Sequence, residues 1–335
     1  MVSHLHLTLA SWQYDRILPL VDGTVRVEGI EINYVPLWPQ EIFYRMLKYK
    51  EFDVAELSFG AYLTSLFTDR SFVAIPVFPS RAFRHNGVFI NARSGIERPE
   101  DLVGKRVGVP EYRQSAAIWT KGIMSDLYGV KPHSVEYFVG PLEDPTKRRR
   151  YFVILSETDV LPKEEKFKVR RVDGKFLSDM LAEGEIDALY SALVPSTFRS
   201  RPDRVKRLFQ NYVEDEKEYF RKTKIFPINH VIVLRRDLYE KHRWIAKSLY
   251  KAFDEAKSIV MDRLSNASGT LHYALPWLFE HYRETVEVMG EDYWPYGLSK
   301  NYKTLDTFIR YAYEQGIIPE RVKPEDIFAK ETTDT

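Results

Sequence analysis

Three basic side chains stand close together just before an apolar run in this sequence. Arg81, Arg84 and His85 fall within FPSRAFRHNGVFIN, and a second histidine, His230, ends FPINH directly before the run VIVL. Guanidinium groups bind carboxylates through paired hydrogen bonds, and imidazole exchanges protons near neutral pH. The pattern therefore indicates an anion site beside an acid–base group. For any one of these side chains the alternative is structural, as an ion pair or a packed histidine.

Strands and helices alternate along the chain, which predicts the α/β fold class. Expected strands cover residues 4–10, 30–35, 52–57, 72–78, 88–91, a segment ending at 110, 135–139, 151–155, 186–190 and 231–234. Expected helices cover 40–48, 115–128, 177–182 and a long segment for which Asp237 is the candidate cap. The VIVL run is apolar without alternation, which is typical of a central strand covered on both faces.

The composition excludes several classes of protein. The 335 residues include 49 Lys and Arg against 48 Asp and Glu, a net charge of +1, so no global field attracts nucleic acid or an acidic membrane. With no cysteine, the chain has no disulfide, thiolate nucleophile or cysteine-ligated metal. No apolar run approaches the roughly 20 residues that span a bilayer, and the N-terminus lacks a signal-peptide pattern. We expect a soluble, cytoplasmic protein.

The most polar part of the chain covers residues 144–175 and includes KRRR at 147–150. A polyanion-binding patch is one interpretation, but the interspersed acidic residues favour a solvated loop or hairpin. No internal repeat or low-complexity linker divides the chain. Two lobes joined by crossing strands explain this organisation better than consecutive domains.

Five stretches carry a resemblance to a known family. They are DVAELSFGAYL, IPVFPSRAFRHNGVFIN, DLVGKRVGVPEYRQSAAIW, GEIDAL and IFPINHVIVLRRDLYE, and YDR near the start and WPYGLSKNYKTL near the end extend the match. The sequence resembles the 4,5-dihydroxyphthalate decarboxylase family over nearly its whole length. DLVGKRVGVP and GEIDAL are similar to type 2 periplasmic-binding-protein folds in general, whereas RAFRHN and FPINH are more specific. The SWQ stretch at 11–13 departs from the glycine-containing stretch expected there, which leaves the exact substrate open.

The resemblance implies a two-lobed α/β protein with a ligand cleft between the lobes. Lobe one would comprise residues 1–92 and 224–335, and lobe two residues 93–223. In such a fold the crossing segments and several helix N-termini face the ligand. Ser58 and Ser115, at the starts of two helices, are candidates for anion binding or for simple helix capping.

The substrate that the family implies is an aromatic ring with two adjacent carboxylates. Arginines are suitable counterions for two negative charges. Arg81 and Arg84 would clamp one carboxylate, Arg113 would approach from across the cleft, and Arg16 from the first loop. An ion pair within the protein is the alternative role for each.

The implied reaction is the non-oxidative loss of carbon dioxide, with 3,4-dihydroxybenzoate as product. Direct loss would leave a carbanion in the ring plane, which the π system cannot stabilise. Protonation of the carboxyl-bearing carbon, with loss of the para hydroxyl proton, avoids that carbanion and needs a general acid and a general base. His85 and His230 are the candidates. Glu56 would receive the hydroxyl proton, orient a histidine or be a buried structural carboxylate, and Tyr14 would contact the ring.

We expect no cofactor. A divalent metal is the less favoured alternative, because His4 and His6 share one face of a strand, as in metal-dependent decarboxylases of the amidohydrolase type, but the later segments do not suit an eight-stranded barrel. Other functions open to the fold are a binding protein for an aromatic or sulfonated anion and a decarboxylase of another hydroxylated aromatic acid. The expected partner is a small aromatic carboxylate, and homo-oligomerisation stays open.

Overall fold

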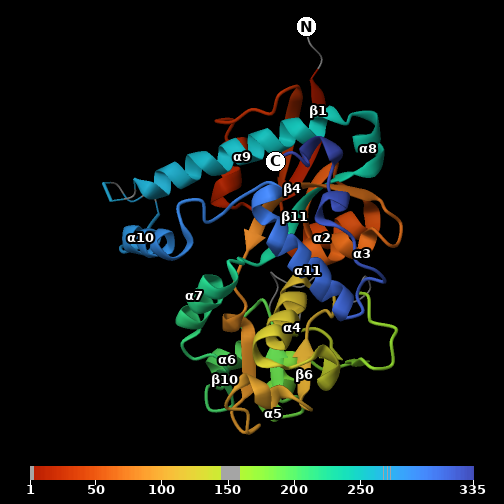
Figure 1. The fold of residues 1–335 in the computed structure, drawn as a ribbon, viewed down its shortest axis with the longest axis vertical. Coiled ribbons are helices and arrows are strands. Elements are labelled where there is room, and N and C mark those ends of the chain that lie inside the picture. Colours follow the sequence, from red (N-terminus) through yellow and green to blue (C-terminus); the bar gives the residue numbers. More distant parts are fainter. Residues whose placement is uncertain (1–3, 145–158, 267, 270, 272) are drawn as a thin grey trace.

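Two β-sheets form the framework of the protein (Figure 1). The structure is a computed structural model that describes residues 4–144, 159–266, 268–269, 271 and 273–335. Within these residues one sheet has five strands in the order β2-β1-β3-β11-β4, and the other has six in the order β10-β5-β9-β6-β7-β8. The sequence predicts this α/β arrangement. The predicted strand at 151–155 and the KRRR cluster lie outside the described residues.

In the first sheet, the start of one inner strand lies beside the ends of its two neighbours. This sheet comprises β1 (Leu5–Ser11), β2 (Ile30–Pro36), β3 (Val54–Ser58), β4 (Phe72–Arg81) and β11 (Ile228–Arg235). β1 runs parallel to β2 and β3, whereas β11 runs antiparallel to both β3 and β4. The VIVL run of β11 is fully buried, as expected for a central strand. In this register His230 lies opposite Ser58 and Ser80.

The second sheet is built from shorter strands. They are β5 (Val88–Asn91), β6 (Arg106–Val109), β7 (Glu136–Val139), β8 (Lys168–Arg171), β9 (Ala188–Tyr190) and β10 (Val205–Arg207). β6, β7, β8 and β9 are parallel, and β5 is antiparallel to β9 and β10. The helices of the protein are α1 (Leu18–Val21), α2 (Pro39–Tyr49), α3 (Phe59–Ser65), α4 (Ser115–Tyr128), α5 (Leu177–Glu183), α6 (Ser196–Ser200), α7 (Tyr212–Thr223), α8 (Arg236–Lys241), α9 (Trp244–Ser265), α10 (Leu278–Met289) and α11 (Tyr302–Glu314).

The chain passes between the two sheets twice, through the segment after β4 and through α7 before β11. The sequence places the first boundary at residue 92, but β5 is hydrogen-bonded within the second sheet, so sheet membership changes between Arg81 and Val88. Below, lobe one denotes residues 4–81 and 228–335, and lobe two denotes residues 88–207, as far as they are described. The predicted division into lobes at residues 92 and 224 stays a prediction.

Helix α4 of lobe two is anchored in lobe one. The indole N–H of Trp119 donates to the carbonyl oxygen of Ile228 at 2.7 Å, and the Gln315 side chain donates to the carbonyl oxygen of Ile118 at 2.9 Å. At Gly60 in α3, an added Cβ would lie 2.2 Å from the carbonyl oxygen of Arg113. Glycine at this position therefore permits the backbones of the two lobes to meet.

The segment after β11 differs from the prediction. The sequence suggests one long helix capped by Asp237, but α8 ends at Lys241 and α9 begins at Trp244. Asp237 lies in the first turn of α8, where its carboxylate accepts from the Arg235 guanidinium at 3.1 Å. No helix in the described ranges is long and apolar enough to cross a bilayer.

Substituting alanine for Gly60 tests the contact between the lobes. Gly→Ala in a helix ordinarily stabilises by roughly 0.5–1 kcal/mol, but here the clash with backbone should dominate and lower the free energy of unfolding by about 1–3 kcal/mol. Urea denaturation measures the change. The matched control is Gly269→Ala, where an added Cβ meets no atom within 4 Å. Equal stability of the two variants would contradict the contact.

Candidate functional site

A cavity of about 230 Å³ lies between the lobes. Pockets for drug-sized ligands measure about 300–1,000 Å³, so this volume suits a single substituted ring. Lobe one and the crossing segment contribute Trp38, Pro39, Gln40, Phe43, Ser58, Ser80, Ala82, Arg84, Asn229 and His230. Lobe two contributes Glu111, Gln114, Ser115, Ala116, Ala192 and Leu193. We call this cavity the cleft.

A buried carboxylate organises the lobe-one wall of the cleft. The Glu56 side chain is 0% exposed, and its Oε1 accepts from the Tyr14 hydroxyl at 2.7 Å and from His230 Nδ1 at 2.5 Å. Its Oε2 accepts from the backbone amide of Trp12 at 3.0 Å. Glu56 and His230 are diagonal neighbours on β3 and β11 and so share one face of the sheet. The loop after β1 reaches them because β1 and β3 are parallel and end at the same edge.

This network leaves one nitrogen of His230 for a ligand. Because Nδ1 donates to Glu56, Nε2 is the ring nitrogen that remains available. The His230 side chain is 19% exposed, and the Phe43 ring packs against it edge-on, with 4.9 Å between ring centroids. Burial and then the nearby charge of Glu56 raise the pKa of Tyr14 well above its ordinary value, so its hydroxyl stays a donor. The predicted residues Glu56, His230 and Tyr14 therefore lie together.

Arg84 and Asn229 bring buried donors to the cleft. Arg84 Nη2 donates to Asn229 Oδ1, and both side chains are buried. Within the described residues, Arg84 Nε and Asn229 Nδ2 have no hydrogen-bond partner. Burial lowers the pKa of Arg84 to about 10, with Glu216 acting in the opposite direction, so the group is cationic at neutral pH. Buried donors without partners are rare in proteins, which indicates a place for ligand oxygens.

Two helix N-termini meet at the cleft. Ser58 Oγ and Ser115 Oγ lie 3.0 Å apart, and Ser115 Oγ accepts from the Gly60 amide at 3.0 Å. Ser58 precedes α3 but makes no capping bond through its side chain, so its predicted role as a cap is wrong. Ser115 caps α3 from the other lobe and not its own helix. The N-cap residue of α4, Gln114, makes no capping bond through its side chain, which leaves the first amides of α4 as anion donors.

Two of the predicted arginines lie off the cleft. Arg81 donates to the carbonyl oxygens of Phe226 at 3.0 Å and Pro295 at 2.6 Å, and also to the Asn301 side chain. Arg16 donates to the carbonyl oxygen of Pro79 and pairs with its neighbour Asp15 at 2.8 Å. Neither residue lines the cavity, and both guanidiniums donate to protein oxygens instead. Arg81 and Arg84 therefore do not form the clamp that their spacing suggests.

Arg113 and His85 also do not line the cavity. Arg113 donates to the Thr64 hydroxyl at 2.9 Å, which is a bond between the lobes, and lies 4.0 Å from the Asp159 carboxylate. His85 is 1% exposed and packs edge-on against Phe209, with 4.9 Å between ring centroids. Burial lowers the pKa of His85 to about 4, so its ring is neutral near pH 7. The placement therefore speaks against His85 as the acid.

Among the cleft residues that sequence reasoning missed are Asn229 and Glu111. Asn229 stands beside His230 in the FPINH motif, and this proximity is a signal that could have identified it. Glu111 follows β6 in GVPEYRQ, and nothing in that stretch indicates that its carboxyl faces the cavity. Burial and then the charge of Asp159 raise the pKa of Glu111 to about 8, with Arg113 opposing. At neutral pH most of this carboxyl is protonated.

The predicted alternative of a metal site involves a different part of the sheet. His6 lies 3.6 Å from Glu31 with a side chain that is 74% exposed, near the start of β1, whereas the cleft lies beyond the end of that strand. Among the described residues no group of three His, Cys, Asp or Glu side chains could hold a metal ion. The expectation of no cofactor stays a prediction.

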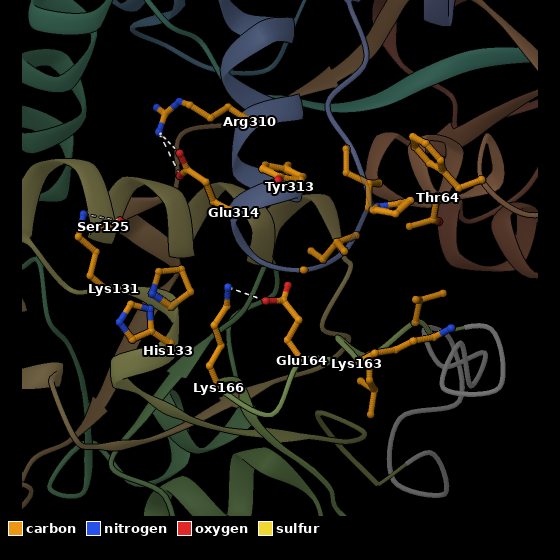
Figure 2. A pocket seen from close by; sticks show the side chains of 18 of the residues that line it. Thr64, Ser125, Lys131, His133, Lys163, Glu164, Lys166, Arg310, Tyr313 and Glu314 are labelled. Atoms are coloured by element: carbon orange, nitrogen blue, oxygen red, sulfur yellow. Dashed lines mark hydrogen bonds and ion pairs between the residues drawn. The ribbon is translucent and has the colours of Figure 1, made fainter.

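A second, larger cavity of about 900 Å³ lies between α4 and α11 and contains many charged side chains (Figure 2). Most of these charges are already paired, as in Arg310 with Glu314 at 3.1 Å and Lys166 with Glu164 at 2.6 Å. Lys131 donates to the Ser125 hydroxyl at 3.3 Å. None of the residues predicted to act on a substrate lines this cavity, so the smaller cleft is the candidate site.

The two lobes and their cleft define a periplasmic-binding-protein-like fold, and solved structures confirm this prediction. The sulfonate-binding protein SsuA from Escherichia coli matches with a TM-score of 0.54 and 13% identity, over 99% of each chain. The putative sulfonate-binding protein SsuA from Methylobacillus flagellatus KT also has a TM-score of 0.54, at 12% identity, over 98% of this chain and 92% of its own. At these identities the likeness establishes the fold alone.

Sequence relatives give the family. The 4,5-dihydroxyphthalate decarboxylase of Comamonas testosteroni is 36% identical over 328 residues, which are 98% of this chain and 97% of that protein. The enzyme of the same name from Pseudomonas putida is 35% identical over 63% of this chain and 80% of its own length. No family model matches the chain. The chain belongs to the 4,5-dihydroxyphthalate decarboxylase family, as its motifs predict.

The buried histidine His85 should make stability depend on pH. The unfolded chain takes up a proton at this residue near pH 6.5, but the folded protein does so only near pH 4. The unfolded state therefore binds more protons between these values, and the free energy of unfolding falls as the pH falls, by up to ~3 kcal/mol from this group. We expect His85→Phe to flatten this part of the urea-denaturation profile, whereas His281→Phe on exposed α10 should not. An unchanged slope in His85→Phe would contradict the assignment.

Proposed function

We propose that the protein releases carbon dioxide from 4,5-dihydroxyphthalate and forms 3,4-dihydroxybenzoate without a redox step. The observation that carries this proposal is the pairing of His230 with buried Glu56 on the same cleft wall as the unpaired donors of Arg84 and Asn229. Such a wall can bind an anionic ring and exchange a proton with it. The curated relatives supply the identity of the ring.

Two adjacent carboxylates of the substrate would meet the cationic side of the cleft. Arg84 and Asn229 offer donors to one carboxylate, and the first amides of α4 offer donors to the other. Arg84 is buried with no carboxylate bonded to its guanidinium among the described residues, so a bound anion compensates a charge that the protein leaves open. The substrate is then held with its hydroxyls towards His230.

His230 acts as the base in this proposal. Its Nε2 accepts the proton of the hydroxyl para to the carboxylate that leaves, while Glu56 holds Nδ1 and stabilises the imidazolium by charge. Protonation of the ring carbon gives a dienone from which carbon dioxide departs as the ring regains aromaticity. The proton that reaches the ring carbon must come from a second group, because His230 is receiving one.

The location of the protein and its metabolic role go beyond what the fold and family define. We propose that the enzyme works in the cytoplasm on a small aromatic carboxylate, as a lyase in the degradation of phthalates. The homologous decarboxylases support the substrate class. Homo-oligomerisation stays a prediction.

Removal of the base tests the proposal. His230→Ala should lower kcat for carbon dioxide release from 4,5-dihydroxyphthalate by about 10²–10⁴-fold, because the hydroxyl loses its proton acceptor. His281→Ala on α10 serves as the control and should turn over normally. Normal turnover in His230→Ala would remove this residue from the mechanism. Stabilisation of the wild-type protein by the compound without any turnover would indicate a binding protein instead.

Arg84 should act mainly in binding. Arg84→Ala should raise the KM for 4,5-dihydroxyphthalate and weaken product binding by about 10–100-fold, since a charge-assisted hydrogen bond contributes about 1.5–3 kcal/mol. Calorimetric titration with 3,4-dihydroxybenzoate separates this effect from turnover. Arg98→Ala, whose side chain is 75% exposed, is the control. An unchanged KM in Arg84→Ala would place the carboxylates elsewhere.

A further inference from the structure

Glu111 is the one carboxyl group that lobe two presents to the cleft, among the described residues that line it. It lies between β6 and α4, on the wall formed by lobe two, whereas His230 stands on the wall formed by lobe one. Within the described residues its carboxyl makes no hydrogen bond and no ion pair. A polar side chain held at a cavity wall without a protein partner is free to serve a ligand.

Burial and the charge of Asp159 keep the proton of Glu111 in place. Asp159 lies on one side, where its carboxylate accepts from the backbone amides of Tyr112 at 2.9 Å and Arg113 at 3.3 Å. Together with burial, its charge raises the pKa of Glu111 to about 8, and the Arg113 guanidinium only partly offsets this. Across the cleft stand Arg84 and His230, and an arriving dianion would raise the pKa of Glu111 further. Glu111 is therefore a carboxylic acid when the substrate binds.

We infer that Glu111 is the catalytic acid that delivers the proton to the ring carbon bearing the departing carboxylate. This inference rests on the proposed decarboxylase function. The reaction needs an acid at one ring carbon and a base at the hydroxyl para to it, which lies at the opposite end of the ring. Glu111 and His230 belong to different lobes and line the same small cavity, so a ring between them meets one at each end.

The proton and electron balance closes with these two groups. Glu111 gives its proton to the ring carbon, and the para hydroxyl gives its proton to His230 Nε2, which forms the dienone. The carbon–carboxylate bond then breaks, its electron pair restores the aromatic ring, and the carbonyl oxygen becomes a phenolate. His230 returns its proton to that oxygen, carbon dioxide leaves, and solvent reprotonates Glu111. One proton is consumed for each carbon dioxide released.

Glu111→Gln tests this role because glutamine keeps the shape and cannot act as the acid. We expect kcat to fall about 10²–10⁴-fold while the affinity for 3,4-dihydroxybenzoate, measured by calorimetric titration, changes less than about threefold. Glu111→Asp should retain an intermediate rate. Glu97→Gln, an exposed glutamate of lobe two, should match the wild type. A raised KM with unchanged kcat in Glu111→Gln would make the residue a binding group and overturn the inference.

A second measurement follows the ring proton without decarboxylation. In D₂O the wild-type enzyme should exchange the product's ring hydrogen at the carbon that lost the carboxylate, and Glu111→Gln should not, as read by proton NMR of 3,4-dihydroxybenzoate. Wild-type kcat/KM, which reports the free enzyme, should fall as the pH rises above about 8, since the acid must be protonated. Exchange at the wild-type rate in Glu111→Gln overturns the role of Glu111 and leaves the proposed function intact. A wild-type protein that releases no carbon dioxide from the substrate overturns both.

Discussion

The buried negative charge of Glu56 constrains the arrangement of the rest of the site. An ionised carboxylate without partners in an apolar interior costs several kcal/mol, so the fold must bring donors to it. Here the donors come from two parts of the chain, the loop after β1 through Trp12 and Tyr14, and β11 through His230. The same three bonds hold the loop against the sheet and fix the orientation of the imidazole. One electrostatic requirement thus couples the packing of lobe one to the orientation of His230, the proposed base.

The cationic side of the cleft differs from this carboxylate, because the Arg84 guanidinium has few acceptors within the protein. Arg84 has a single amide oxygen as its side-chain partner, and its Nε is buried without one among the described residues. Burying a polar group without a partner lowers stability, and such groups in native proteins are concentrated where ligands bind. Arg81, only three residues away, donates through both terminal nitrogens to two carbonyl oxygens and an amide oxygen, although its Nε is also buried without a partner among the described residues. What distinguishes the two arginines is that Arg84 lines the cleft with one bonded terminal nitrogen, whereas Arg81 lies off it with both terminal nitrogens bonded to protein oxygens.

Local patterns in the sequence predicted the elements and the family well, and side-chain partners poorly. The helix at 115–128 and the strand at 88–91 match α4 and β5, because apolar periodicity and Gly129 at the helix end are local signals. The RAFRHN cluster was misjudged for a physical reason. Arg81 ends a strand and Arg84 lies beyond it, so their separation in sequence does not place them on one face. The pKa of Glu111 is raised by burial and then by the charge of Asp159, 48 residues later in the chain, and no local pattern reveals either cause.

The contacts between the lobes explain how a fold shared with solute-binding proteins can keep groups from both lobes at fixed positions around a ligand. In such folds, hinge motion closes two lobes around a ligand. Here Ser115 of lobe two caps α3 of lobe one, and Arg113 reaches the Thr64 hydroxyl across the same boundary. These bonds flank the cleft, so closure would set the proposed acid of one lobe and the proposed base of the other at a fixed separation. Proton transfer requires the donor and the acceptor to lie within about 3 Å of the reacting atoms. The polar contacts between the lobes therefore belong to the catalytic geometry as much as the groups that move the protons.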